Sequence, residues 1–315
     1  MTVFALIGLV EALLAIMLAP LFIGWIDQCR AWLQNRSGAG LLQPYRTLRK
    51  LLHKDAVIAH GASSLFRVSP YIQFGAMAMA TAIIPVFSVR APFGVAADTI
   101  ALVGVFALAR VFMALAAMDI GTAFGTLGAR REMLVGFLSE PALLMVFLTA
   151  SLISQSTLLP TIVDVLGQIH LTIFPSLAFA AIAFVMVLLA ENARIPIDNP
   201  STHLELTMIH EAMVLEYSGR HLALIEWSSA LKLFNYAAIG VALFVPWGLA
   251  GRAAGPIELA LALPIAAAKL AIAGAALAVV ETLSAKLRIF RAPEFLATAF
   301  LLAVLGLLVH LMLES

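Results

Sequence analysis

Residues 171–190 read LTIFPSLAFAAIAFVMVLLA, an apolar block that ends directly before the acidic stretch ENARIPIDNPSTHLELTMIHEAMVLEYSG at 191–219. The block has no charged side chain, and about 20 apolar residues are enough for a helix to cross a bilayer. Similar blocks recur along the 315 residues, of which 63% are hydrophobic and only 12% charged. A soluble domain carries about twice that charged fraction. The sequence therefore predicts an all-α polytopic membrane helix bundle.

The apolar blocks predict about eight transmembrane helices in a single domain that covers residues 1–315. The predicted spans are 3–26, 71–89, 98–118, 140–159, 171–190, 222–249, 257–282 and 294–313. The first block has no basic segment before it and no clear cleavage site, so we interpret it as a span rather than a signal peptide. The expected surroundings are the lipid bilayer, and no nucleic acid is expected among the partners.

Basic residues between the spans lie almost entirely in every second loop. Fourteen fall on one side: Arg30, Arg36, Arg46, Arg49, Lys50, Lys54, Arg67, Arg130, Arg131, Arg194, Arg220, Lys286, Arg288 and Arg291. Only Arg90 and Arg252 fall on the other side. The positive-inside rule then predicts both termini outside, a basic cytoplasmic loop at about 28–69 and an acidic cytoplasmic loop and helix at about 191–220. The expected location is the cytoplasmic (inner) membrane.

Several charged residues fall inside the predicted spans or at their edges. Arg110, Lys232 and Lys269 are the bases, and Glu140 and Glu226 are two of the acids. Each costs about 2.5–3.5 kcal/mol near the bilayer centre, so such residues face the bundle interior and often pair. Lys232 and Lys269 therefore have either a water-connected functional role or structural ion pairs. Glu140 precedes Pro141, and this pair is also typical of the first turn of a helix.

The stretch 191–219 holds five acids, Glu191, Asp198, Glu205, Glu211 and Glu216, against the single Arg194. Pro200 or the sequence Thr202–Glu205 predicts a helix start, and the helix would run towards Tyr217. At 100° per residue Glu205 and Glu216 would share one face. Like charges and partial burial raise carboxyl pKa values, so these groups are candidates for binding and releasing protons. The alternative is a solvated loop with a capped helix.

Cofactor chemistry within this chain is limited by its thiols. Cys29 is the only cysteine, so no disulfide can form within the chain. One thiolate cannot hold an iron–sulfur cluster or a nickel–iron centre. We therefore expect no cofactor and no metal in this chain.

Three motifs point to a family. Residues 190–198, AENARIPID, match the pattern A-E-x-x-R-x-P-x-D, and EYSG follows at 216–219. QNRSGAG at 34–40 and LLQP at 41–44 resemble Q-x-R-x-G-P followed by L-L-Q-P. Together they resemble the membrane-anchor subunit of respiratory complex I, over almost the whole chain. Glu140 also matches an acid of that family at the start of a helix.

Two departures narrow the resemblance. Complex I subunits usually carry E-R-K where this chain has Ile26-Asp27-Gln28, and the acidic loop here is about three residues longer. The version THLELTMIHEAMVLEYSG is similar to the membrane subunit of group 4 [NiFe] hydrogenases, which include hydrogenase-4 and formate hydrogenlyase. The resemblance implies a non-catalytic subunit that couples redox chemistry to translocation of protons (or sodium). The implied partners are a cytoplasmic [NiFe] hydrogenase and its iron–sulfur subunits, which would hold the metal centres, and antiporter-like membrane subunits.

The resulting hypothesis assigns two sets of residues. The proton-transfer and coupling candidates are Glu140, Glu191, Asp198, Glu205, Glu211, Glu216, Glu226, Lys232 and Lys269. The candidates for docking the partner module are Gln34, Arg36, Gly38, Gln43, Arg46 and Arg194. Three alternatives stay open: a quinone-binding subunit of complex I, a stand-alone secondary transporter, which inverted repeats would support, and a passive anchor.

Overall fold

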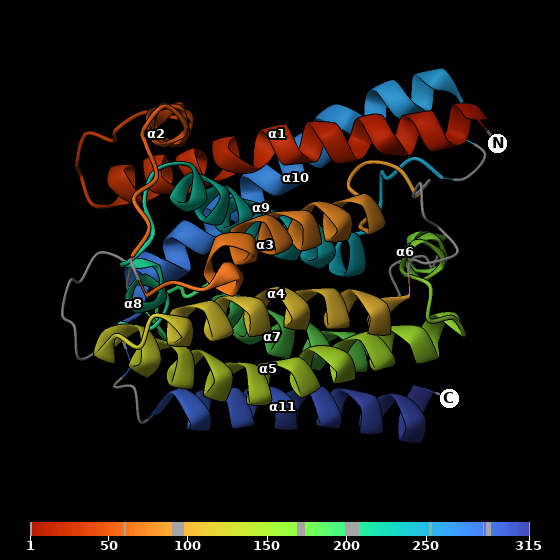
Figure 1. The fold of residues 1–315 in the computed structure, drawn as a ribbon. Coiled ribbons are helices and arrows are strands. Elements are labelled where there is room, and N and C mark those ends of the chain that lie inside the picture. Colours follow the sequence, from red (N-terminus) through yellow and green to blue (C-terminus); the bar gives the residue numbers. More distant parts are fainter. Residues whose placement is uncertain are drawn as a thin grey trace.

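The structure, a computed structural model, describes residues 2–59, 61–89, 98–168, 174–198, 208–251, 254–285, 287 and 291–314. Within these ranges eight helices of 17 to 32 residues form one bundle (Figure 1). They are α1 (Thr2–Leu33), α3 (Ser64–Ile83), α4 (Thr99–Asp119), α5 (Ala123–Ser154), α7 (Pro175–Glu191), α9 (Gly219–Phe244), α10 (Pro256–Leu283) and α11 (Ala292–Val309). Shorter elements are α2 (Gln43–Leu52), α6 (Leu159–Gln168), α8 (His210–Val214) and a π-helical turn at His310–Glu314.

Each predicted span corresponds to one of the eight long helices, which confirms the all-α polytopic bundle. Five of the described helices, α1, α4, α5, α10 and α11, are long and apolar enough by themselves to cross a membrane. Helix α7 is apolar but only 17 residues long, and α9 carries polar residues such as Glu226, Lys232 and Asn235. Helices α3, α7 and α9 therefore depend on their neighbours to cover polar groups or to complete the span.

The predicted start of the fourth span at Glu140 was wrong. Helix α5 begins at Ala123, where the side chain of Thr122 accepts a hydrogen bond from the backbone N–H of Gly125. Pro141 lies inside the helix rather than at its first turn. Proline is tolerated within membrane helices because neighbouring groups satisfy the freed carbonyl. Glu140 is consequently placed at mid-helix, and the basic pair that precedes it lies on α5 instead of in a loop.

The predicted helix from about residue 200 to Tyr217 was also wrong. Residues 199–207, including Glu205, lie outside the described residues. Met208 and Ile209 are not helical, α8 covers only His210–Val214, and Glu216 lies in the turn that follows. Asp198 explains where α8 begins, because its Oδ2 accepts hydrogen bonds from the backbone N–H groups of Ile209 and His210, at 3.1 and 3.3 Å.

The bundle is layered. Helices α1 and α10 pack together on one side, α5 and α11 on the other, and α3, α4, α7 and α9 lie between them (Figure 1). Aromatic side chains fill the centre: Tyr236 stacks on Phe106 with ring centroids 4.9 Å apart, and Phe184 packs beside them. The N- and C-termini lie at one end of the bundle and α2 and α8 near the other (Figure 1). This agrees with termini on the same side; which side of the membrane that is stays a prediction.

Candidate functional site: a buried ionic cluster

A buried arginine on α4 holds three carboxylates. Arg110 is 5% exposed, and its Nη1 lies 2.5 Å from Oε1 of Glu140. Its Nη2 contacts Oε2 of Glu191, and its Nε lies 3.6 Å from Oε1 of Glu132. Glu132 and Glu140 come from α5, and Glu191 is the last residue of α7. The guanidinium therefore ties three helices together at one point.

Glu191 is the most enclosed acid of the group. Its side chain is 1% exposed and lies 3.0 Å from Nζ of Lys232 on α9. The hydroxyl of Ser139 donates a hydrogen bond to its other oxygen. Tyr236 lies beside it and interacts with both Glu191 and Arg110. We define the ionic cluster as Arg110, Lys232, Glu132, Glu140 and Glu191, which contains one more acid than base.

A glycine makes room for the guanidinium. A Cβ built on Gly136 of α5 would overlap Nη1 and would lie 2.8 Å from Cδ of Arg110. Gly136 is one helical turn from both Glu132 and Glu140, so the guanidinium lies against bare backbone between the two carboxylates. The closeness of α4 and α5 thus depends on a residue without a side chain.

Two small cavities flank the ionic cluster. The first, about 50 Å³, is lined by Arg110, Glu132, Gln73 and Ser228 among others. The second, about 80 Å³, is lined by Glu191, Asn192 and Arg194 among others. His210, Ser229, Lys232 and Glu132 line both. Each volume is large enough for water, and each has the several polar partners that a buried water needs.

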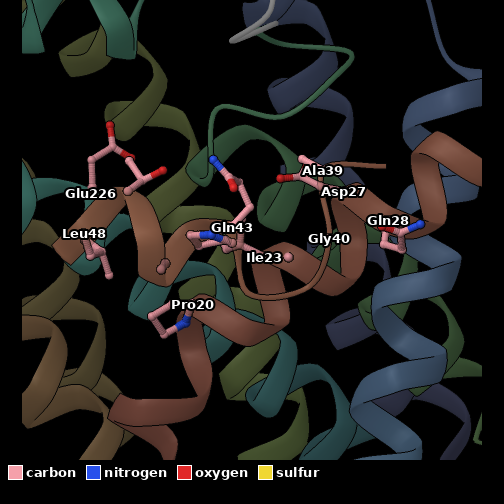
Figure 2. A pocket seen from close by; sticks show the side chains of 13 residues that line it. Pro20, Ile23, Asp27, Gln28, Ala39, Gly40, Gln43, Leu48 and Glu226 are labelled. Atoms are coloured by element: carbon pink, nitrogen blue, oxygen red, sulfur yellow. The ribbon is translucent and has the colours of Figure 1, made fainter. Parts of the chain in front are cut away.

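A larger cavity of about 230 Å³ lies between α1, α2 and α9 (Figure 2). We call it the α1–α2–α9 cavity. Its polar lining includes Asp27, Gln28, Gln43 and Glu226, and apolar residues such as Pro20, Ile23 and Leu48 complete the wall. The loop before α2 covers it by folding back on α1: a Cβ on Gly24 would collide with the carbonyl of Leu41, and one on Gly38 with the side chain of Gln28.

An ion bridge joins this region to the ionic cluster. Glu281 of α10 has a 1% exposed side chain; its Oε1 lies 3.2 Å from Nη1 of Arg194, and its Oε2 lies 3.5 Å from Nη1 of Arg30. Arg30 also pairs with Asp27, at 2.9 Å. Asp27 lines the α1–α2–α9 cavity and Arg194 lines the 80 Å³ cavity beside Glu191. Glu281 therefore links the surroundings of the two cavities.

The EYSG motif anchors the acidic segment to the basic loop. The rings of Tyr217 and Phe66 stack with their centroids 3.9 Å apart. The Tyr217 hydroxyl donates a hydrogen bond to the backbone carbonyl of Phe66. Burial raises the pKa of the Tyr217 phenol. Ser218 Oγ accepts from the backbone N–H of Val57 and donates to its carbonyl. Gly219 has a φ of +52°, and a Cβ there would lie 2.8 Å from the carbonyl oxygens of Lys54 and Asp55. Three of the four motif residues thus have structural partners.

The other predicted coupling residues lie outside the ionic cluster. Glu211 is half-buried, Glu216 is exposed, and Asp198 is the buried cap of α8. Glu226 lines the α1–α2–α9 cavity. Lys269 donates to the carbonyl oxygens of Val245 and Trp247, at 2.6 Å for Val245, in the connection between α9 and α10. The structure therefore gives Lys269 backbone partners rather than one of the acids of the ionic cluster.

The predicted docking residues divide into two groups. Gln34, Arg36, Gln43 and Arg46 are exposed, and Gly38 is half-buried against Gln28. The Arg194 side chain is only 11% exposed and pairs with Glu281. The described residues hold no group of three or more His, Cys, Asp or Glu side chains that could bind a metal ion.

Comparison with known proteins assigns the family. The family model described as NADH dehydrogenase matches residues 5–312. The chain belongs to the NADH dehydrogenase family. Formate hydrogenlyase subunit 4 of Escherichia coli K12 is 33% identical over 299 residues, which are 95% of this chain and 96% of that protein. Hydrogenase-4 component C of the same organism is 35% identical over 244 residues, 77% of this chain and 76% of that protein.

A more distant relative and one solved structure are also similar to this chain. A subunit of the NADH-quinone oxidoreductase of Phocaeicola vulgatus is 27% identical over 230 residues, 69% of this chain and 61% of that protein. A chain in the structure of a membrane-bound sulfane sulfur reductase, an archaeal respiratory membrane complex, superposes with a TM-score of 0.81 at 20% identity and shares the fold. The superposition covers 97% of this chain and 98% of the other chain. The resemblance found in the motifs is confirmed: this member of the NADH dehydrogenase family is a multi-pass membrane subunit of a complex I-related energy-converting complex.

The centre of the ionic cluster was not among the residues assigned from sequence. Arg110 was recognised as a charge inside a span, but its partners lie 22, 30 and 81 positions away in sequence. Glu132 belonged to a predicted loop, and Ser139, His210 and Glu281 were not selected. For Arg110 the sequence did contain a signal, because a charge inside a membrane span is costly unless it is paired and therefore indicates buried acids nearby. No comparable signal marked Ser139 or His210.

The role of Gly136 gives a test. We expect Gly136→Ala to destabilise the protein by about 1–3 kcal/mol, because the added methyl group overpacks against Arg110. Gly104→Ala, on the exposed face of α4 with no atom within 4 Å of the added Cβ, is the matched control. It should be neutral or stabilising by about 0.5–1 kcal/mol, because alanine favours a helix over glycine. Unfolding of both purified variants by a denaturing detergent measures the difference, and equal stability would contradict the packing argument.

Proposed function

We propose that this chain is the membrane-anchoring and energy-coupling subunit of a group 4 energy-converting [NiFe] hydrogenase in the cytoplasmic membrane. It docks a cytoplasmic hydrogenase module, whose own subunits hold the [NiFe] centre and the iron–sulfur clusters. It passes the energy of that redox chemistry to proton (or sodium) translocation, together with antiporter-like membrane subunits. The similarity to formate hydrogenlyase subunit 4 and hydrogenase-4 component C supports the type of complex. The observation that carries the coupling role is the ionic cluster around Arg110.

The ionic cluster suits proton storage because its charges do not balance. Two cations face three carboxylates in the interior of an apolar bundle. A net charge there is costly, so binding one proton makes the site neutral and losing it leaves one excess negative charge. Any nearby change of charge or geometry shifts this balance. Glu140 is the best position for the mobile proton, because its side chain is 33% exposed while Glu191 is enclosed.

A series of polar groups leads from the docking side to this proton. Glu226 lines the α1–α2–α9 cavity and interacts electrostatically with Glu211 and His210. His210 Nε2 lies 3.3 Å from Oγ of Ser229, and both residues line the two small cavities beside Lys232. Water in these cavities would complete a path from Glu226 through His210 to Lys232, Glu191 and Glu140. Glu211 and the exposed Glu216 are proposed as proton donors and acceptors at its start.

Redox change in the docked module is proposed to reach the ionic cluster through Glu281. A shift of the loop before α2 moves Asp27 and Arg30, and Glu281 transmits the change to Arg194 and the end of α7. Glu191 is three residues from Arg194, so the electrostatic balance of the ionic cluster responds. Asp198 holds the start of α8, and Arg194 positions the same segment from the other side. Lys269 is proposed to act further along, at the connection between α9 and α10.

Docking is proposed to use the exposed polar segment that runs from the end of α1 into the first turn of α2. Gln34, Arg36, Gln43 and Arg46 are all exposed there, while Gly24 and Gly38 let the segment lie close to α1. The segment is therefore held in place while its polar side chains remain available. Arginine suits such a contact because its planar donors bind carboxylates in a bidentate manner.

Reversing two of these charges tests docking. Arg36→Glu together with Arg46→Glu should release the hydrogenase module from membranes at lower salt than the unchanged protein, because attraction becomes repulsion. The matched control is Arg67→Glu together with Arg220→Glu, which reverses two exposed arginines outside the segment. Sedimentation of membranes across a salt series measures the module that stays bound. Equal release from both double variants would show that the effect comes from the net charge of the protein and not from a contact made by Arg36 and Arg46.

Removing one titratable proton tests coupling. In Glu140→Gln we expect the complex to assemble, because Arg110 keeps Glu191 and Glu132, and we expect dye-linked hydrogenase activity to survive. Proton uptake by sealed vesicles, divided by dye-linked turnover of the same vesicles, should fall to the level of uncoupled vesicles. Glu258→Gln, an exposed acid in the first turn of α10, is the control for the same chemical change and should keep the ratio. An unchanged ratio in Glu140→Gln would leave the chain as a passive anchor.

A quinone-binding role is the second candidate, and the α1–α2–α9 cavity is the observation that favours it. The cavity combines an apolar wall with Asp27, Gln28, Gln43 and Glu226, which suits a ring with polar oxygens. A subunit of an NADH-quinone oxidoreductase is among the relatives. A quinone retained by the purified complex, and lost in a variant with Ala230 enlarged to fill the cavity, would favour this function over hydrogenase coupling.

A further inference from the structure

A fourth cavity, near one end of the bundle, takes no part in the path described above. It has a volume of about 350 Å³ and lies between the first turns of α5 and the start of α11. This is the end of the bundle where α8 lies (Figure 1). Two arginines, Arg130 and Arg131, line it together with apolar side chains. We call it the α5–α11 cleft.

The charge in the α5–α11 cleft favours an anion. Arg130 is exposed, and no acid among the described residues lies within 4.0 Å of its guanidinium. Arg131 is half-buried, donates from Nη1 to the carbonyl of Met208 at 3.0 Å, and lies in the field of Asp198. Arg130 is therefore the principal anion contact. The exposed Arg291 lies directly before the lining residue Ala292, and Glu294, one turn further, is not part of the lining.

The rest of the lining suits a hydrocarbon chain. The apolar part of the lining is formed by Leu127, Leu134, Val135, Ile209, Ala292 and Pro293. A free phosphate ion would contact the arginines alone and leave this apolar wall uncovered. A phospholipid uses both parts, because its phosphate meets the arginine and its acyl chain follows the wall. Basic pockets between membrane helices on the cytoplasmic side are typical sites for anionic lipid headgroups.

We propose that the α5–α11 cleft binds one membrane phospholipid with a net negative headgroup, such as phosphatidylglycerol. Its phosphate pairs with Arg130, and one acyl chain lies along Leu134, Ala292 and Pro293. The lipid holds the first turns of α5 against α11, and Arg130 lies about three helical turns before Glu140. This inference does not depend on the type of complex proposed above.

The test uses the whole complex in nanodiscs of phosphatidylcholine. The probes are phosphatidylglycerol and phosphatidylcholine that carry the same diazirine-labelled acyl chain, each added in small amount. After photolysis, peptide mapping compares the labelling of 127–135 and 292–293. We expect the phosphatidylglycerol probe to label these peptides more strongly. Equal labelling by the two probes, or labelling abolished by inorganic phosphate, would overturn the proposal. Absence of label in the assembled complex would also overturn it, since a partner subunit would then cover the cleft.

Two variants separate the headgroup from the wall. Arg130→Gln should lower the labelling preference for phosphatidylglycerol about fivefold. This is the change in affinity expected when one arginine near an anionic membrane surface is lost. Arg67→Gln removes an exposed arginine elsewhere on the chain and should leave the preference unchanged. Leu134→Trp, at a 49% exposed position of the wall, should reduce labelling by both probes at these peptides. An unchanged preference in Arg130→Gln, with labelling intact, would contradict the assigned phosphate contact.

Discussion

A guanidinium in the middle of an apolar helix bundle must be surrounded by anions. Removing one partner of a buried ion pair costs about 3–5 kcal/mol, because an uncompensated charge remains. Arg110 meets this requirement with acids from α5 and α7, so the positions of α4, α5 and α7 are fixed with respect to one another. Gly136 and Ser139 serve the same ion pairs. Gly136 leaves space for the guanidinium, and the Ser139 hydroxyl donates a hydrogen bond to Glu191. The geometry needed to hold the arginine is also the geometry proposed to hold a proton.

The polar contacts of the chain are of two kinds. Some hold segments of the chain in fixed positions, and others involve groups whose protonation or partners can change. Tyr217, Ser218 and Gly219 hold the acidic segment to α3 and to residues 54–57, and Asp198 fixes the start of α8. These groups join segments that are far apart in sequence and therefore suit a fixed frame. His210, Lys232 and Glu140 line cavities or are partly exposed, so their protonation and contacts can change without breaking the frame. Glu281 belongs to both classes because it is buried yet shared by two arginines from different segments.

The sequence predicted the bundle well because membrane spans depend on local composition, which is readable over 20 residues. It failed at Glu140, where Pro141 suggested a helix start although α5 continues through it. It also failed between 208 and 217, where a capping pattern suggested a continuous helix and the described residues hold only α8. Lys232 and Lys269 look alike in sequence, yet one meets Glu191 and the other meets carbonyls of the α9–α10 connection. Contacts between residues far apart in sequence decide that difference, and no periodicity within one helix contains it.

We propose that the ionic cluster around Arg110 changes its proton content when the partner module changes redox state. Redox-triggered infrared difference spectroscopy of the purified complex observes this directly, because a protonated carboxyl group has a C=O stretch separate from that of a carboxylate. We expect a carboxylic acid band in the reduced-minus-oxidised spectrum of the unchanged complex, and we expect this band to be lost when Glu140 is replaced by Gln. A spectrum in which that band is missing from the unchanged complex, or persists unaltered after the replacement, would contradict a redox-linked proton at the ionic cluster.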